Sequence, residues 1–475
     1  MSADADRGDD TAVKAPEDLE DLALDEDYAL TAEFVDMVID AADRSDGARI
    51  AELVAALRPA DVADLMGFLT ADYRAEIVPH IPPDELAEIL SELDTNIREE
   101  VLEIVAPATL ARALEELDSD DAADVVDDLD EAMRERVLAA LPPLERTAIE
   151  ASLAYEDETA GRLMQREVAL APQFWTVGQA LDHLSRESES LPELFFDLYV
   201  VDPAMKPVGA APVSHLLRAR RETPLTEIME PVTEIPVDMD QEEVAYIFDK
   251  YHLISAPVVE PGGRLVGQIT VDDIVGVIQD ESEEDMLALA NVSDAGRDAS
   301  TVGIVRSRLP WLVLNLFTET VAVSAIALFQ DEIARVVALA VLMPIISSLG
   351  GNAGTQTLAV AVRALASREL NASNTTRIIM RELAAGILNG FGLSVVMGVA
   401  VMMFYHDARL ALTAALALMA DIVVAAVGGI LAPLILERLG RDPAVSSSIW
   451  VTFLTDLMGF FAVLAIAAII LLPGH

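Results

Sequence analysis

The chain has 475 residues, no cysteine and a formal net charge of −50 at pH 7. The lack of cysteine excludes disulfides and thiolate metal sites, and so acidic a chain lacks the basic surface that nucleic acids need. Residues 301–475 hold ten acidic residues and ten arginines, so the negative charge belongs to the first 300 residues. The sequence therefore predicts an acidic soluble half joined to an apolar half, with no nucleic acid as a partner.

Residues 1–29 are rich in Asp, Glu and Ala and hold few large apolar side chains. This composition predicts an acidic flexible tail. The segment also lacks the apolar core of a signal peptide, so we expect the soluble half to stay in the cytoplasm.

A twelve-residue repeat follows. From Leu57 to Leu153 an apolar residue recurs at every twelfth position. Four of these residues are followed, two positions later, by a proline: Pro59, Pro83, Pro107 and Pro143. Proline suits the first turn of a helix, and short helices that cannot bury an apolar face alone stack into solenoids. Residues 30–155 are thus predicted to form an α-helical superhelical repeat domain.

Carboxylates crowd this domain and are densest between residues 118 and 128, where no lysine lies nearby. Asp120 and Asp124 are four residues apart and share one helix face, with Asp121 beside them. The run fits either a solvated helix face or a cation site, and both interpretations stay open.

Short apolar strands then alternate with helices. Residues 196–201 and 256–259 are predicted to be buried strands, and residues 262–270 a turn followed by another strand. Each strand pair is followed by a helix. The pattern predicts two α/β units, at residues 156–222 and 223–285.

The second unit ends in acids. Glu281, Glu284 and Asp285 share one helix face, and a carboxylate surface with few amines suits hard cations such as Mg²⁺ or Ca²⁺. A merely solvated helix end is the alternative. Residues 286–308 are expected to form a connecting helix, with Pro310 in the first turn of the helix that follows.

Residues 309–475 are predicted to be a transmembrane domain with five helices. Each of five apolar segments exceeds the roughly 20 residues that cross a bilayer core. These segments are 309–330, 333–364, 382–404, 409–437 and 443–472. Arginines gather on one side of the spans, which predicts a multi-pass protein of the plasma (inner) membrane with a cytoplasmic N-terminus and an outer C-terminus.

The second span carries Pro344, three glycines within residues 350–354, and the amides Asn352 and Gln356 on one helix face. Irregular backbone within a membrane is tolerated where it is buried in protein or lines a watery cavity. We expect this helix to be broken and to line a pore, although the glycines alone also fit a small-residue packing seam.

Three carboxylates lie well inside predicted spans: Glu319, Asp421 and Asp456. Placing a charge within the membrane costs free energy, so each of these acids needs a structural or functional explanation. We favour a water-filled cation path for Asp456 over a hydrogen-bonded structural acid. For Glu319 and Asp421 the two interpretations are balanced.

These residues resemble known families. The two α/β units resemble a tandem pair of cystathionine-β-synthase (CBS) domains, on LISAPVVEPGGRLVGQITVDDIVGVI in the second unit. The first is degenerate at VGAAPVSHLL, which leaves ATP binding by the pair in doubt. The stretches RLPWLVLNL, LMPIISSLGGNAGTQTLAVAVRALA and RLGRDPAVSSSIWVTFLTDLMG, with the domain order, resemble the MgtE family of magnesium channels and transporters.

The resemblance implies a homodimer with the pore between its two chains. Asp456 would then be the selectivity carboxylate, with Asn352 and the carbonyls near Gly350 lining the same path. It places cytosolic Mg²⁺-sensing sites on eight further acids: Asp120, Asp121, Asp124, Asp273, Glu281, Glu284, Asp285 and Asp442. Gly276 departs from the family, which often has another acid there.

The resemblance therefore implies a Mg²⁺-selective channel or transporter, gated by cytosolic Mg²⁺, that mediates magnesium uptake. Mg²⁺ would be both transported and regulatory. The alternatives are a transporter of another divalent cation such as Co²⁺ and a membrane-anchored CBS sensor. No phosphate-cradling loop, nucleophile with a base or imidazole metal cluster supports an enzyme.

Overall fold

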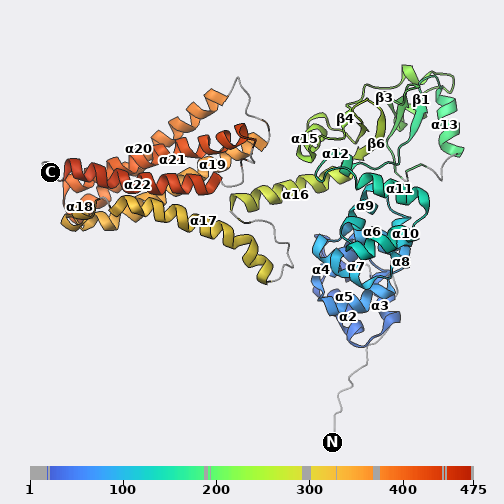
Figure 1. Ribbon diagram of the computed structural model, residues 1–475, viewed down its shortest axis with the longest axis horizontal. Coiled ribbons are helices and arrows are strands. Elements are labelled where there is room, and N and C mark those ends of the chain that lie inside the picture. Colours follow the sequence, from blue (N-terminus) through green and yellow to red (C-terminus); the bar gives the residue numbers. More distant parts are fainter. Residues whose placement is uncertain are drawn as a thin grey trace, which may run out of the picture. The chain divides into compact units, whose positions relative to one another are not determined.

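The computed structural model describes residues 22–186, 194–290, 301–327, 329–366, 375–440 and 447–471, with the single positions 19, 191, 192, 292, 368 and 443. The chain divides into two compact units, with the boundary after Ile278 (Figure 1). The first unit holds the repeat helices and both α/β units, and the second holds the long apolar helices.

The repeat domain is built from short helices. They are α2 (Ala32–Asp43), α3 (Gly47–Val54), α4 (Pro59–Phe68), α5 (Ala71–Ile77), η1 (Val78–His80), α6 (Pro83–Glu92), α7 (Thr95–Ile104), α8 (Pro107–Leu114), α9 (Ser119–Asp127), α10 (Glu131–Ala140) and α11 (Pro143–Ser152). Proline begins α4, α6, α8 and α11, as predicted. The twelve-residue repeat positions are buried or partly buried in one continuous core. The predicted helical stack is therefore confirmed.

This core reaches further toward the N-terminus than expected. Leu19 and Ala23 are buried in it. Thr31 donates its hydroxyl to the carbonyl of Leu22 at 2.7 Å and accepts a hydrogen bond from the amide of Phe34, which caps α2. The prediction of a flexible tail as far as residue 29 is therefore wrong at its C-terminal end, because two apolar side chains anchor that end.

The α/β part follows. Its elements are α12 (Ala160–Leu163), β1 (Leu170–Pro172), α13 (Val177–Arg186), β2 (Asp197–Val201), β3 (Pro207–Pro212), α14 (Val213–Arg218), η2 (Leu225–Glu227), β4 (Ile235–Pro236), α15 (Gln241–Tyr251), β5 (Ser255–Val259), β6 (Leu265–Thr270) and α16 (Val271–Leu289). In the first sheet β1 is parallel to β2 and β2 is antiparallel to β3. The second sheet repeats this pattern with β4, β5 and β6. The predicted pair of α/β units is confirmed.

Two boundaries differ from expectation. Helix α16 runs without a break from Val271 to Leu289, so no separate connecting helix begins at residue 286, and residues 293–300 of that expected helix lie outside the described residues. The next helix, α17 (Thr301–Ala327), begins well before Pro310, which lies inside it. Pro310 is therefore not in a first turn. The preceding residues continue the helix, and the proline removes only one backbone hydrogen bond.

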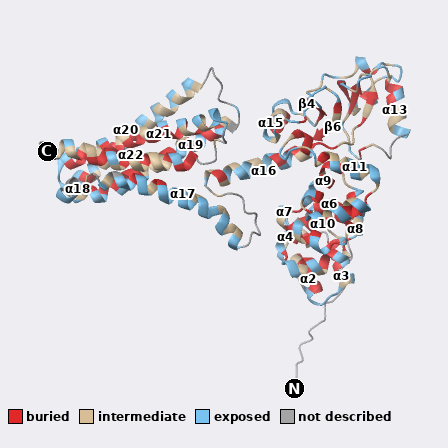
Figure 2. Cartoon of the chain, viewed as in Figure 1, coloured by how far each residue is buried: buried red, intermediate tan, exposed pale blue. Residues whose placement is uncertain are grey.

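The second unit is a bundle of α17, α18 (Gln330–Arg335), α19 (Ala338–Ala366), α20 (Thr375–Tyr405), α21 (Ala408–Arg438) and α22 (Ser447–Ile470). Helix α21 packs against α19, α20 and α22, and α17 packs against α22. Figure 2 shows the buried residues of these helices where they face one another. Among the described residues four helices, α19 to α22, are long and apolar enough to cross a membrane. The first of the five expected spans falls on α17 and stays a prediction.

Helix α19 is continuous through Pro344 and the glycines. The expectation of a broken helix is therefore wrong. The glycines serve close packing instead, since a Cβ on Gly429 of α21 would lie only 2.7 Å from the carbonyl oxygen of Gly354. Small residues allow this approach between membrane helices.

Candidate cation sites

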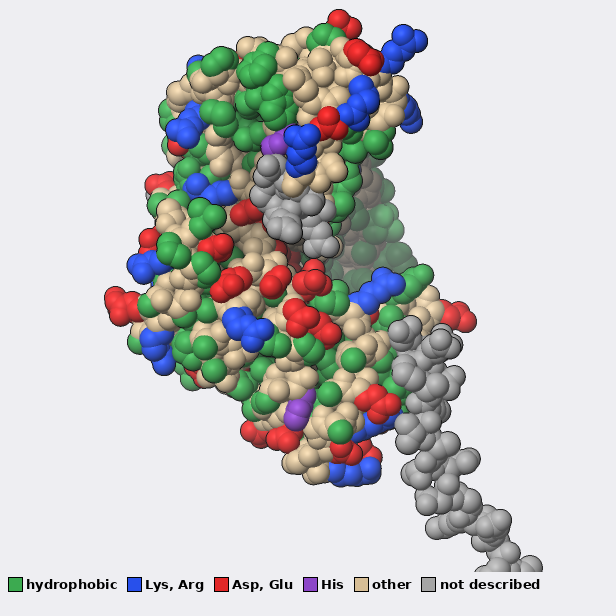
Figure 3. All heavy atoms as spheres, turned by 90° about the vertical axis from the view of Figure 1, so that its right-hand side faces the viewer, with side chains coloured by type: hydrophobic (Ala, Val, Ile, Leu, Met, Phe, Trp, Pro, Cys, Tyr) green, Lys and Arg blue, Asp and Glu red, His purple; other side chains and the backbone are tan. Residues whose placement is uncertain are grey.

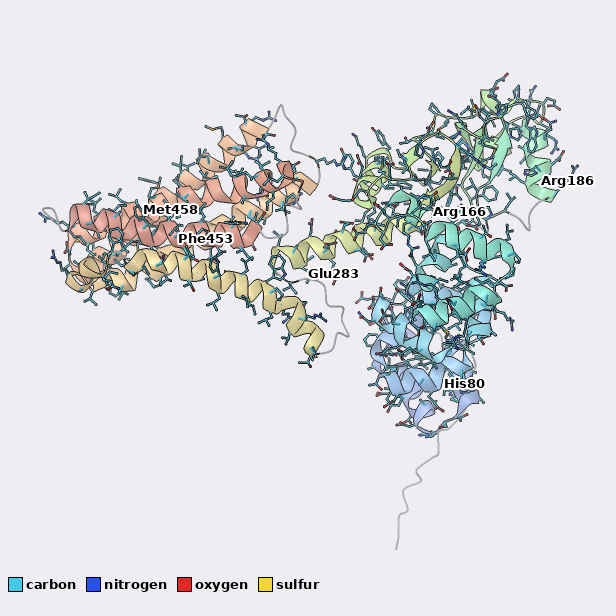
Figure 4. The ribbon with its side chains drawn as sticks, viewed as in Figure 1. His80, Arg166, Arg186, Glu283, Phe453 and Met458 are labelled. Atoms are coloured by element: carbon cyan, nitrogen blue, oxygen red, sulfur yellow. The ribbon has the colours of Figure 1, made fainter. Side chains whose placement is uncertain are left out.

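Three acidic residues of the bundle converge. They are Glu319 on α17, Asp421 on α21 and Asp456 on α22, and we call them the bundle acids. Glu319 and Asp421 are each close enough to Asp456 to interact with its carboxylate. Figure 4 labels Phe453 and Met458, which flank Asp456 along α22.

A fourth helix contributes a hydroxyl. Ser347 on α19 is buried and donates its Oγ proton to Oδ1 of Asp456. Sequence reasoning missed Ser347, since a serine in a long apolar helix gives no sign of its partner. The selectivity carboxylate predicted at Asp456 thus lies in a polar cluster formed by side chains of four helices.

Asp421 has the most closed surroundings of the bundle acids. Its side chain has no exposed surface, and neither carboxylate oxygen has a hydrogen-bond partner within the described part of the chain. A Cβ on Gly350 would collide with Oδ2 of Asp421, and one on Gly459 would lie 3.3 Å from Oδ1. Two glycines on two helices therefore leave the room that this carboxylate occupies.

Helix α19 has two different faces. Gly350 and Gly354 face the neighbouring helices, so the packing-seam interpretation is right for them. Asn352 and Gln356 lie on the opposite side, and both are exposed. The amides therefore share an open polar face, as their spacing predicted.

A second acidic group lies in the first unit. We define the α9–α16 acid cluster as Asp118, Asp120, Asp121 and Asp273. Burial, and then the charge of Asp273, raise the pKa of Asp121 to about 7. Burial raises the pKa of Asp273 to about 6, although its Oδ2 accepts a hydrogen bond from Thr270 at 2.7 Å. The same causes raise the pKa of Asp120 well above its usual value. Asp120 is buried, and its Oδ1 has no partner among the described residues.

Hydrogen bonds hold this cluster in place. Ser119 donates its hydroxyl to Glu167 at 2.9 Å, and its own Oγ accepts from the amide of Arg166 at 2.8 Å. Gln165 donates to Asp118 at 3.2 Å. Arg166 is labelled in Figure 4. The segment that enters the first α/β unit therefore fixes the N-terminal end of α9 beside the start of α16.

Asp124 has a different environment from its neighbours. Arg162 lies 3.1 Å from both Asp124 and Asp127. An arginine so placed neutralises part of their charge, so Asp124 belongs to an ion-pair network rather than to the α9–α16 acid cluster. On the face drawn in Figure 3, acidic and basic side chains are likewise intermingled.

The remaining predicted ligands are Glu281, Glu284, Asp285 and Asp442. Glu281, Glu284 and Asp285 lie on the last part of α16, in the second unit, where Glu283 is labelled in Figure 4. Asp442 lies outside the described residues. Those residues contain no group of three or more His, Cys, Asp or Glu side chains that could hold a metal ion.

Comparisons with known proteins match three parts of the chain. Residues 343–466 match the MgtE family model, described as a divalent cation transporter. Residues 57–158 match the MgtE intracellular N domain, and residues 225–280 match the CBS domain. The resemblance drawn from the sequence motifs is thereby confirmed.

Individual relatives agree. The magnesium transporter MgtE of Bacillus subtilis is 32% identical over 332 residues, which are 70% of this chain and 73% of that protein. The protein of the same name from Thermus thermophilus is 33% identical over 346 residues, 72% and 76% of the two chains. A crystal structure of the cytosolic domain of the Mg²⁺ channel MgtE in complex with ATP is 33% identical, covers 51% of this chain and 99% of its own, and has a TM-score of 0.48.

Proposed function

Because this chain belongs to the MgtE family of divalent cation transporters, we propose that it carries Mg²⁺ across the plasma membrane, into the cell, along a path beside the bundle acids. The observation that supports this most is the convergence of Glu319, Asp421 and Asp456 within an apolar bundle. Intramembrane acids mark ion paths because they are costly elsewhere.

The chemistry of the site suits a hydrated ion. Mg²⁺ dehydrates reluctantly and usually keeps several of its waters. Carboxylate and amide oxygens can hold such an ion through these waters, without the compact ligand group that a bare metal needs. We propose that two chains form a homodimer, so that Asp456 is contributed twice and the open face of α19, with Asn352, lines the same path.

We further propose that cytosolic Mg²⁺ closes this path. Acids of the α9–α16 acid cluster repel one another, and a divalent cation between them would remove this repulsion. Mg²⁺ would therefore favour the conformation in which the repeat domain and the second CBS unit are held together, by its higher affinity for that state. Asp124, Glu281, Glu284, Asp285 and Asp442 are proposed as further regulatory ligands.

The topology proposed from the arginines is a cytoplasmic N-terminus and an outer C-terminus. ATP binding by the CBS pair stays an open prediction. Two other functions are tested by the same experiment: transport of another divalent ion such as Co²⁺, and a sensor whose helices only anchor it. In each case the chain is a transporter or sensor rather than an enzyme.

The test is Mg²⁺ flux into proteoliposomes that contain the full chain, with Mg²⁺ varied separately on each side. We expect flux that falls when Mg²⁺ is raised on the side of the soluble unit, and no flux from Asp456→Ala that elutes as a folded protein. Retained uptake by that variant would remove Asp456 from the path. Absence of flux under every gradient would favour the sensor, and equal flux of Co²⁺ would show a general divalent transporter.

A further inference from the structure

Asp421, like Glu319, is a bundle acid for which the sequence favoured no role. It lies near the middle of α21, has no exposed surface, and neither oxygen has a hydrogen-bond partner within the described residues. Structural carboxyls in protein interiors are hydrogen-bonded or paired with a base, because burial otherwise costs too much. Asp421 therefore lacks the features of an acid kept for stability.

The side chain of Asp421 occupies a recess between neighbouring helices. Gly350 on α19 and Gly459 on α22 form the recess, and a Cβ on Gly350 would fill the position of the carboxylate. These two helices also carry Asn352 and Asp456, the predicted lining of the ion path. The recess thus opens a place for negative charge directly behind that lining.

No basic residue of the bundle would offset a negative charge on Asp421. Residues 301–475 contain no lysine, and their arginines lie at or near the helix ends or between the helices. Asp421 instead faces Asp456, another acid, which itself contacts Glu319. An opposite charge nearby favours the ionised form of a carboxyl group, so a divalent cation beside Asp456 would ionise Asp421 and be attracted by both carboxylates.

We propose that Asp421 is a second cation-attracting carboxylate of the path, which acts from behind the lining and sets the affinity for divalent over monovalent cations. This proposal rests on the proposed function, since it assumes that the ion passes Asp456. The carboxylate of Asp421 acts on the hydrated ion through space, by its charge, in addition to packing between α19 and α22.

The experiment compares Asp421→Asn with the wild type in proteoliposomes containing the full chain. The amide has nearly the same shape but no charge, so we expect the half-saturating Mg²⁺ concentration to rise about tenfold and Na⁺ leak to increase, since a lost charge a short way from the ion changes binding by this order. Asp407→Asn on the same helix is the matched control. Asp407 caps α21, and asparagine caps helices equally well, so its flux should stay unchanged.

A second variant separates charge from packing. In Gly350→Ala/Asp421→Ala the new Cβ occupies the room that the carboxylate leaves, so packing between α19 and α21 is restored while the charge stays absent. We expect its Mg²⁺ affinity to stay as low as that of Asp421→Asn. Wild-type affinity in either variant, with Asp456→Ala inactive, would overturn the role of Asp421 alone. An active Asp456→Ala would instead overturn the proposed path.

Discussion

Asp121 on α9 and Asp273 in the first turn of α16 lie close enough that the charge of Asp273 raises the pKa of Asp121. The two residues come from different domains, the helical repeats and the second CBS unit. Their contact therefore places a repulsion at the junction of these domains, beside the hydrogen bonds that fix the start of α9. Protons or cations that offset the charge of this pair would stabilise the junction.

The first prediction concerns pH. The pKa of Asp121 is about 7 and that of Asp273 about 6 in the folded unit, against an ordinary value of 3.8. Between about pH 4 and pH 7 the folded unit therefore binds protons that the unfolded chain does not. In the absence of Mg²⁺, the free energy of unfolding should fall as pH rises through this window. Hydrogen exchange of the α9 amides in the full chain measures it, as protection factors that remove the intrinsic acceleration of exchange with pH. Protection that grows as pH rises through this window would contradict it.

The second prediction concerns Asp121→Asn. The amide removes a partly buried charge from a repelling group. The Mg²⁺-free protein should therefore gain about 1–2 kcal/mol in the stability of α9. Protection by added Mg²⁺ should shrink at the same time, because one ligand of the proposed regulatory site is lost. The control is Asp64→Asn on α4, an acid far along the chain from the cluster. Equal Mg²⁺ protection in Asp121→Asn and the wild type would show that the cluster does not bind the ion.

The third prediction concerns Gly276 on α16, which is exposed and where an added Cβ meets no atom within 4 Å. Gly276→Asp should fold normally and add an acid one turn from Asp273. We expect the Mg²⁺ concentration that half-inhibits flux to fall several-fold. Gly276→Asn supplies the same volume and no charge, so it should leave that concentration unchanged. An equal shift in both variants would assign the effect to helix stability.

The fourth prediction concerns the contact between α19 and α21. A Cβ on Gly429 would lie 2.7 Å from the carbonyl oxygen of Gly354 and 2.9 Å from Cβ of Thr357. Gly429→Ala should therefore force the helices apart and cost about 1–3 kcal/mol, measured as a lower thermal midpoint in detergent. Gly392→Ala on α20, where a Cβ meets nothing within 4 Å, should cost nothing. Equal thermal midpoints for the two variants would mean that α19 and α21 can move apart without a loss of stability.

Much of this architecture could be read from periodicity. The twelve-residue repeat with its prolines predicted the starts of α4, α6, α8 and α11, because proline at the first helical position is a local preference. Predictions from local sequence preferences failed where the packing between helices determines the structure. Pro344 and the glycines predicted a broken α19, yet the glycines are there because α21 and α22 come close.

The candidate sites divide in the same way. The spacing of Asp120 and Asp124 predicted their shared helix face, with Asp121 beside them. Only the fold brings Asp273 close to Asp120 and Asp121. The partner of Asp456 on α19, Ser347, could not be found from spacing, because the helix register between two distant segments is set by their packing. The recess around Asp421 likewise depends on glycines of two other helices.

The two faces of α19 have a consequence for how such a protein can diverge. Positions 350 and 354 are limited by size, because their neighbours leave no room for a side chain. Positions 352 and 356 are exposed, so size does not limit them, and only their chemistry does. Under the proposed function, mutations on the open face would therefore alter which ion is favoured without disturbing the assembly of the bundle. Ion preference and folding would then change independently along one helix.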